Sequence, residues 1–247
     1  MKQTPNVRYL NRRQWLELMG GAFAASLAGG AAVGAGLFSS YTPAVVAGCV
    51  VSPAQTEGPY FVDEKLNRSD IRIGPSDGSV SLGVPLSLVL NVFKVTNNSC
   101  EPLPGATVDI WHCDAAGVYS DVADHTGDAR GKKFLRGYQV TDADGKVEFQ
   151  TIYPGWYHGR TVHIHYMVRT ESTSGTAGGR EFTSQLYFAE SITDEVHSQA
   201  PYSEKGKRDM RNERDFIYKD GGAQAMMRLV KNEEGYVGTY NVGFQMT

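Results

Sequence analysis

Two histidines separated by one residue, His163 and His165, occur in the segment GWYHGRTVHIHYMV. Alternate residues of a β-strand point to the same side, so a strand here would direct both imidazoles toward one metal ion. The pair alone does not identify a metal site, because histidines in the core or in solvent are commoner than ligands. Tyr157 and Arg160 stand just before the pair, and Tyr119 follows the strand-like segment IWHCDAAG.

Two tyrosines beside two histidines restrict the kind of metal. A phenol has a pKa of about 10, so it is not an anion at neutral pH. A tightly bound trivalent cation ionises it, because the charge of the ion dominates the pKa values around it. Anionic oxygen suits ferric iron better than ferrous iron, and four such ligands leave room for hydroxide or substrate. We therefore expect Fe(III) bound by Tyr119, Tyr157, His163 and His165.

Longer motifs around these residues resemble one family. The chain reads LPGATVDIWHCDAAGVYS, then TDADGKVEFQTIYPGWYHGRTVHIH, then TSQLYF, and it has TEGPYF at residues 56–61. These segments, within residues 49–202, resemble the intradiol ring-cleavage dioxygenase family, and within it the compact, exported branch. The resemblance implies non-haem Fe(III) as cofactor, a catecholic compound and O2 as substrates, and a cis,cis-muconate-type diacid as product.

The site residues of the family match this chain position by position. Its four metal ligands fall on Tyr119, Tyr157, His163 and His165. The resemblance implies that Tyr157 dissociates from the metal when the substrate binds. Arg160 matches the arginine that stabilises negative charge on the substrate. Gln185 matches the glutamine near the substrate, which would orient the substrate or a group behind it.

One departure from the family lies between the second tyrosine and the histidine pair. Soluble members have a longer stretch there, which shapes the substrate pocket, whereas only HGRTV intervenes in this chain. The assignment of the metal ligands does not depend on that stretch, but the identity of the substrate does. Catechol, hydroxyquinol, protocatechuate and chlorinated or lignin-derived catechols all stay open.

Three residues are candidates for the surroundings of the substrate. Tyr60 belongs to TEGPYF, which in the family runs near the active site, so it is a candidate for the substrate pocket. Trp156 is a second candidate, although its ring is equally suited to burial against the sheet. His158 lies between Tyr157 and a glycine, and we expect it at the mouth of the site at most.

The remaining histidines have simpler interpretations. His112 and Asp114, in WHCDA, invite a ligand interpretation. However, His112 shares a strand face with Val108 and Ile110, which favours a hydrogen-bonded core histidine or one that supports the ligands. The last two, His125 and His197, lie in polar segments where solvent exposure is expected.

The segments around these residues have the pattern of an all-β protein. Alternating stretches rich in branched and aromatic residues predict strands over 86–95, 107–113, 138–141, 147–152, 161–169, 183–188 and 236–244. The turn DADG at 142–145 predicts a hairpin between two of them. The expected fold is an antiparallel β-sandwich with long loops, among them a flexible loop over 172–180. Little helix is expected beyond a short one over 208–218.

Part of this pattern also fits a different class of protein. PGATVDI, TDADGKVEF and PGWY occur in transthyretin-like and Cna-B-like sandwiches, which are exported binding or adhesive modules without metal or catalysis. These segments therefore support the fold alone. The residues that such a module has no reason to hold together are Tyr119, Arg160, His163, His165 and Gln185. A protein that keeps the fold and the iron without turnover is a third alternative.

Residues 1–47 have the pattern of an export signal, and the sandwich domain is expected over 48–247. Arg12 and Arg13 precede residues 18–38, which include no charged side chain and are followed by small residues. The adjacent arginines resemble a twin-arginine signal of bacteria. We therefore expect an exported protein, in the periplasm or outside the cell.

The end of the signal and the cysteines leave several alternatives open. Cleavage before Gly48, lipidation of Cys49 and retention as a membrane helix are all compatible with the sequence. Membrane contact would be limited to the signal or to a lipid on Cys49. In an exported protein a disulfide from Cys49 to Cys100 or Cys113 is favoured, because an extended strand would hold the latter two apart.

The composition of the chain limits its partners. It has 247 residues, of which 41% are hydrophobic and 21% charged, as in a globular protein. A net charge of −3 argues against nucleic acid as the main partner. The expected partners are a small catecholic aromatic and O2. The domain shows no clear N-terminal helix of the kind through which longer relatives associate, so we expect a monomer.

Overall fold

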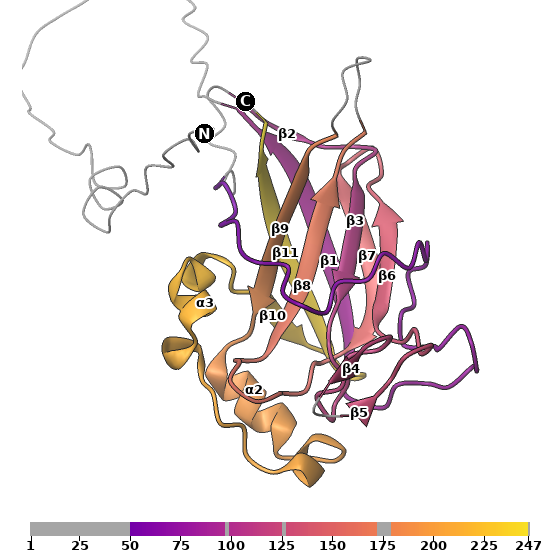
Figure 1. Cartoon of the computed structure of the whole chain (residues 1–247). Helices are drawn as coiled ribbons and strands as arrows, with labels where there is room; N and C mark the ends of the chain where they lie inside the picture. The colour runs from indigo at the N-terminus through magenta and orange to yellow at the C-terminus, as the bar shows by residue number, and fades with distance from the viewer. Residues whose placement is uncertain (1–49, 97–98, 125–126, 172–178, 247) are drawn as a thin grey trace, which may run out of the picture. The chain divides into compact units, whose positions relative to one another are not determined.

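Two β-sheets share one hydrophobic core (Figure 1). The computed structural model describes residues 50–96, 99–124, 127–171 and 179–246. It confirms the predicted all-β sandwich with long loops and little helix. The predicted signal over 1–47 lies outside the described residues, as do His125 and residues 172–178 of the predicted loop. Within the described ranges, no helix is long and apolar enough to span a membrane.

The first sheet is built around β1. Its strands are β1 (Pro85–Val95), β2 (Cys100–Pro102), β7 (Lys146–Ile152), β10 (Arg228–Lys231) and β11 (Tyr236–Gln245). Strand β1 is antiparallel to β2 and β7 but parallel to β11. The sandwich is therefore not antiparallel throughout. A parallel pair is possible here because β1 and β11 are far apart in the sequence and no tight turn joins them.

The second sheet holds three of the predicted site residues, His163, His165 and Gln185. In spatial order its strands are β6 (Arg136–Val140), β3 (Thr107–Trp111), β8 (His163–Arg169) and β9 (Glu181–Tyr187), all antiparallel. Residues directly opposite each other in such pairs share a face. One row of opposite residues runs across the whole sheet: Arg136, Trp111, His165 and Gln185.

Strand β8 alternates between the two faces of its sheet. Ile164, Tyr166 and Val168 enter the core between the sheets. His163 and His165 are buried on the opposite, outer face. The prediction that these two histidines project together is confirmed, and their burial means that other segments cover this outer face.

A strap formed by residues 50–68 crosses the outer face from β9 to β6 (Figure 1). At one edge, the N–H of Gln55 donates to the carbonyl of Thr183 in β9, at 3.0 Å. At the other edge, the N–H of Tyr138 in β6 donates to the carbonyl of Leu66, at 2.8 Å. The strap thereby places TEGPYF over the histidines. A small hairpin follows later in the chain, β4 (Ala123–Asp124) with β5 (Gly127–Asp128).

The turn at residues 142–145 connects the two sheets and does not close a hairpin. It follows β6 in the second sheet and precedes β7 in the first, so the predicted hairpin is wrong. Asp142 Oδ1 accepts backbone N–H groups of Asp144 and Lys146 at 3.0 and 2.8 Å, and Gly145 has a φ of 74°. These features are those of a hairpin turn, so the local sequence did not reveal the change of sheet.

The helices of the described residues follow β9 and are all short: α2 (Glu190–His197), η1 (Tyr202–Lys205), η2 (Asn212–Arg214), α3 (Phe216–Lys219) and η3 (Gly222–Gln224). The helix predicted over 208–218 is wrong as a single element, because Asp215 ends η2 and caps α3. His197 is half-buried, contrary to the prediction of exposure. Its Nε2 lies 3.0 Å from the carbonyl of Pro154, and its ring stacks on Tyr202 at 5.1 Å.

The described cysteines differ in state. Cys100 is disulfide-bonded, whereas Cys113 is a free, buried thiol. The prediction that these two are not joined to each other is confirmed, since Cys100 lies in β2 and Cys113 lies after the end of β3. Cys49 lies outside the described residues.

Candidate metal centre

Four side chains from three segments meet on the outer face of the second sheet. The Nε2 atom of His163 lies 3.0 Å from Nε2 of His165. The same atom lies 3.2 Å from the hydroxyl of Tyr157 and 3.4 Å from that of Tyr119. All four residues are buried. The structure therefore brings together the four residues predicted as metal ligands.

Two loops that carry the tyrosines are locked to each other. Asp114 Oδ1 accepts two backbone N–H groups of the Tyr119 loop, at 2.9 and 2.8 Å. The carbonyl of Asp114 accepts the N–H of Gly155 in the Tyr157 loop, at 3.1 Å. Gly117, with a φ of 82°, is so close to the second loop that a Cβ would lie 2.1 Å from a backbone oxygen. Asp114 is thus engaged in shaping the loops.

Hydrogen bonding and burial set the state of the two histidines. Nδ1 of His163 lies 2.6 Å from the carbonyl of Thr161. A carbonyl can only accept, so Nδ1 is assigned the proton and Nε2 directs a lone pair into the cluster. Burial lowers the pKa of His163 to about 3 and that of His165 well below its ordinary value. Both imidazoles are therefore neutral at pH 7, which is the form that ligates a metal.

The tyrosines become anionic ligands only beside a strong cation. Burial raises the pKa of Tyr119 and of Tyr157 above the ordinary value of a phenol, so neither ionises by itself. In the part of the chain that the structure describes, no group of three or more His, Cys, Asp and Glu side chains could hold a metal ion. A metal centre here depends on the two phenols, and two phenols with two neutral imidazoles fit ferric iron.

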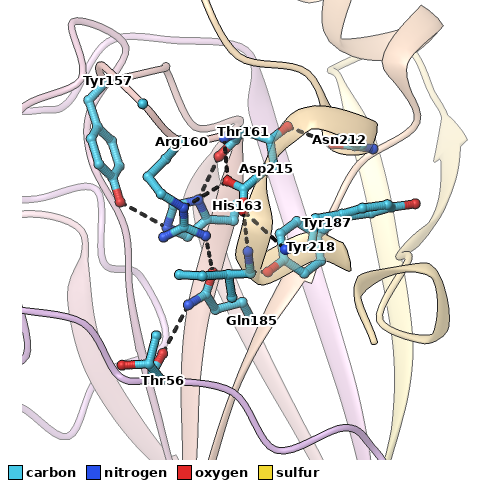
Figure 2. Close-up of polar contacts among 12 residues, drawn as sticks. Thr56, Tyr157, Arg160, Thr161, His163, Gln185, Tyr187, Asn212, Asp215 and Tyr218 are labelled. Carbon is cyan, nitrogen blue, oxygen red and sulfur yellow. Dashed lines mark hydrogen bonds and ion pairs between the residues drawn. The ribbon is translucent and has the colours of Figure 1, made fainter. Parts of the chain in front are cut away.

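Arg160 stands beside the cluster in a network of polar groups (Figure 2). Its Nε donates to Asp215 Oδ2 at 2.7 Å and its Nη2 donates to Gln185 Oε1 at 2.6 Å. Gln185 Nε2 donates to the carbonyl of Thr56 at 2.9 Å, and its Oε1 also accepts from the hydroxyl of Tyr187 at 3.1 Å. Both ends of the Gln185 amide are engaged by the protein, so this residue orients Arg160.

Asp215 is a site residue that the sequence interpretation missed. Its carboxylate is fully buried, and Oδ1 accepts the N–H groups of Ile217 and Tyr218 at the start of α3, at 2.8 and 3.0 Å. Burial acts to raise its pKa, but hydrogen bonds from Tyr218 and Thr161 and the charge of Arg160 hold that pKa below the ordinary value. An aspartate before FIYK is a helix-start signal, which the single helix predicted over this region obscured.

Tyr60 lies against the cluster. Its ring stacks on that of Tyr119, with centroids 4.4 Å apart and an interplanar angle of 20°, and meets the ring of Tyr157 edge-on at 5.9 Å. Gly58 in the same strap has a φ of 70°, and a Cβ on it would lie 3.4 Å from Cε1 of His165. The strap therefore forms one wall of the site.

Three other candidates lie away from the four converging side chains. Trp156 packs against the main core, and the Nζ of Lys205 lies 4.8 Å from its ring centroid. His158 is exposed and pairs with Asp209. His112 is fully buried, with Nε2 2.6 Å from a threonine hydroxyl of β7 and Nδ1 2.8 Å from a carbonyl. The interpretation of His112 as a hydrogen-bonded core residue is confirmed.

Comparison with known proteins finds one matching family model and several similar proteins. The family model described as Dioxygenase matches residues 56–216. Catechol 1,2-dioxygenase of Candida albicans is 31% identical over 153 residues, covering 54% of this chain and 46% of that protein. The protocatechuate 3,4-dioxygenase beta chain of Burkholderia cepacia is 30% identical over 130 residues, covering 47% and 53%. The chain spans about half the length of the curated relatives it matches.

Solved structures match over more of their length. An intradiol ring-cleavage dioxygenase from Tetranychus urticae is 32% identical with a TM-score of 0.66, covering 80% of this chain and 95% of that chain. The dioxygenase domain of a dioxygenase carbohydrate-binding protein fusion from Streptomyces sp. SirexAA-E is 30% identical with a TM-score of 0.52, covering 80% and 98%.

Proposed function

The chain belongs to the intradiol ring-cleavage dioxygenase family, and on this basis we propose that it uses Fe(III) and O2 to cleave a catechol-type ring between its two hydroxyl-bearing carbons. The product would be a cis,cis-muconate-type diacid that contains both atoms of O2. The observation that supports this best is the convergence of two buried tyrosines and two neutral histidines beside a fixed guanidinium. A transthyretin-like or Cna-B-like binding module would give no account of that set.

The residues that would hold the iron are Tyr119, Tyr157, His163 and His165. When bound, ferric iron supplies Lewis acidity and a template that orients the catechol for reaction with O2. The protein holds both imidazoles in place through contacts behind them. The ring of Trp111 stacks on His165 at 5.0 Å and 6°, and the carbonyl of Thr161 holds Nδ1 of His163. The hydrogen bond sets the tautomer and direction of His163, and the stacking sets the ring plane of His165.

Tyr157 is the ligand that would exchange with the substrate. It lies in the loop before β8, next to the exposed His158, and it is 9% exposed, against 2% for Tyr119. Burial raises the pKa of the free Tyr157 phenol. Its Oη, once released, would therefore take the proton of one catechol hydroxyl, and that transfer needs no separate general base.

Arg160 would stabilise negative charge that develops on the substrate ring. Its side chain is 12% exposed, and Asp215 and Gln185 hold it from two sides. A fixed cation in a site shielded from water stabilises such charge without having to reorganise during the reaction. Gln185 would act on the substrate through Arg160.

Oxygen uptake by the iron-loaded protein tests the proposal. The panel is catechol, hydroxyquinol, protocatechuate and a chlorocatechol, with the product from ¹⁸O2 identified by its mass. We expect a red-brown protein that consumes one O2 per ring and gives a diacid with two labelled oxygens. A colourless protein that binds no iron and stays inactive on the whole panel after iron loading would contradict it.

We also propose export through residues 1–47, which rests on the sequence alone. Replacing Arg12 and Arg13 together by lysine is expected to block secretion, because the signal type is defined by the arginine pair. The matched control is Lys2→Arg, which changes a basic residue outside the pair. Unchanged secretion of the double variant would point to another route.

A further inference from the structure

Arg136, at the start of β6, is a buried guanidinium outside the ligand set. It is 2% exposed. Its Nε donates to the carbonyl and the hydroxyl of Ser120 at 3.1 and 2.9 Å, and its Nη2 donates to the same carbonyl at 2.6 Å. Its Nη1 donates to the carbonyl of Tyr60 at 2.6 Å. One side chain thus joins the residue after Tyr119 to the strap.

The same two segments also meet through their rings. Tyr60 stacks on Tyr119 with centroids 4.4 Å apart and an interplanar angle of 20°. Tyr157 has only edge contacts with these rings, at 86° to Tyr60 and 77° to Tyr119. Tyr119 is therefore held by a stacked ring and by the bonds of Arg136 to the adjacent Ser120, whereas Tyr157 has no stacked ring partner among these residues.

We infer that Arg136 and Tyr60 form a clamp that keeps Tyr119 on the metal while Tyr157 is free to leave it. Arg136 is a positioning residue, since it acts through the Ser120 backbone. The inference rests on the proposed function, because it concerns a ligand of the proposed iron. The clamp would explain why Tyr119 stays on the metal when Tyr157 leaves it, although both ligands are tyrosines.

The charge of Arg136 fits this role. Within the described residues its hydrogen bonds all go to uncharged oxygens, so the buried charge is not neutralised in contact. Burial lowers the pKa of Arg136 to about 10, and attraction to Tyr119, Glu64 and Asp121 opposes that effect. A phenolate at Tyr119 would add a negative charge to those of the two carboxylates, so this phenolate and the buried guanidinium would stabilise each other.

The register of the second sheet explains why the clamp is rigid. Arg136 and Gln185 end the row that contains Trp111 and His165. At one end Arg136 holds the Tyr119 loop, and at the other end Gln185 holds Arg160. Groups on paired strands keep their spacing better than groups on loops do, so one row sets a ligand and a cation on either side of His165.

The test compares Arg136→Lys, Tyr60→Leu and the control Arg72→Lys. Lysine keeps the charge but not the planar fork that reaches two segments at once. Arg72 is a half-buried arginine outside the strap, and its guanidinium bonds the carboxylate of Asp70 at 3.0 and 2.7 Å. The readouts are iron content, the rate of iron loss to excess chelator and the phenolate-to-iron charge-transfer band. We expect iron loss at least tenfold faster in the first two variants and wild-type behaviour in the third.

Iron loss within twofold of wild type and an unchanged band in both clamp variants would overturn the inference. If Arg136→Lys does not fold, Tyr60→Leu decides, because it leaves the carbonyl of residue 60 and its bond to Arg136 in place. A different result would show that the proposed function itself is wrong. A wild-type protein that binds no iron would overturn that function together with the clamp, whereas a coloured wild type with unaffected variants overturns the clamp alone.

Discussion

Asp215 and Arg160 form a buried ion pair in which Oδ2 accepts from Nε at 2.7 Å. The same oxygen accepts the N–H of Thr161 at 2.8 Å, and the carbonyl of Thr161 lies 2.6 Å from Nδ1 of His163. One carboxylate oxygen therefore fixes the position of the Arg160 guanidinium and of the backbone that orients His163. Its own position is fixed because its other oxygen caps α3.

Asp215→Asn is expected to lower kcat by about tenfold to hundredfold and stability by about 3 kcal/mol, with a smaller loss of iron than in His163→Ala. Asparagine keeps the shape and the cap but removes the countercharge of Arg160, and an unpaired buried charge is costly. Steady-state oxygen uptake, iron analysis and urea unfolding measure the three quantities. Asp128→Asn is the control, because its ion pair with Arg130 is exposed. Wild-type kcat in Asp215→Asn would contradict the role of the pair.

His163→Ala is expected to lose iron, whereas Tyr157→Phe is expected to keep part of it and to bind catechol more slowly. Nε2 of His163 lies within 3.4 Å of each of the other three donors, so its removal opens the centre of the site. Tyr157→Phe removes the ligand that would exchange with the substrate. Iron analysis and stopped-flow measurement of anaerobic catechol binding test this. Equal iron in His163→Ala and wild type would remove this histidine from the ligand set.

The histidine pair could be predicted because it depends on one short-range rule, the twofold period of a strand. The partners of Arg160 could not be, because Asp215 is 55 positions away and Gln185 is 25 away. Arg136 was missed for the same reason, since it joins residues 16 and 76 positions away. No local pattern states that these segments meet.

In the fold, too, local features could be predicted from the sequence and contacts between distant segments could not. Alternating segments predicted the strands and the sandwich, since burial of one face of each strand imposes that pattern. The partner of a strand is not a local property. The turn at 142–145 has hairpin chemistry but joins two sheets, and the parallel pairing of β1 with β11 depends on residues about 150 positions apart, as for Leu86 and Tyr236.

Gly58→Ala is expected to weaken iron binding, and Gly78→Ala is its matched control. Both glycines have left-handed backbones, with φ of 70° and 68°, so alanine strains each by roughly 1 kcal/mol. Of the two, only Gly58 would bring the new Cβ into van der Waals contact with a ligand, at 3.4 Å from Cε1 of His165, so a shift that relieves the backbone strain there would also displace that imidazole. Urea unfolding should show similar losses in both variants, while chelator competition should show weaker iron binding in Gly58→Ala alone. Equal iron affinity in the two variants would mean that the strap does not press on His165.

His112 gives a prediction about pH that does not involve the metal ligands. Burial lowers its pKa to about 4, whereas the pKa of an unfolded histidine is about 6.5. Between these values the unfolded chain binds more protons than the folded chain, so the free energy of unfolding falls as the pH is lowered through this window. The contribution is complete above about pH 6.5 and lost below about pH 4, and its size is about 3 kcal/mol.

His112→Gln removes this contribution, since glutamine does not titrate. The variant is expected to be less stable than wild type at neutral pH, because glutamine replaces an imidazole held by Thr151 and a carbonyl. The difference should shrink by about 3 kcal/mol as the pH falls to about 4, because only the wild type loses stability by protonating residue 112 in the unfolded chain. Urea unfolding of the iron-free proteins across this range measures the difference. A difference that stays constant with pH would show that His112 does not have a lowered pKa in the folded protein.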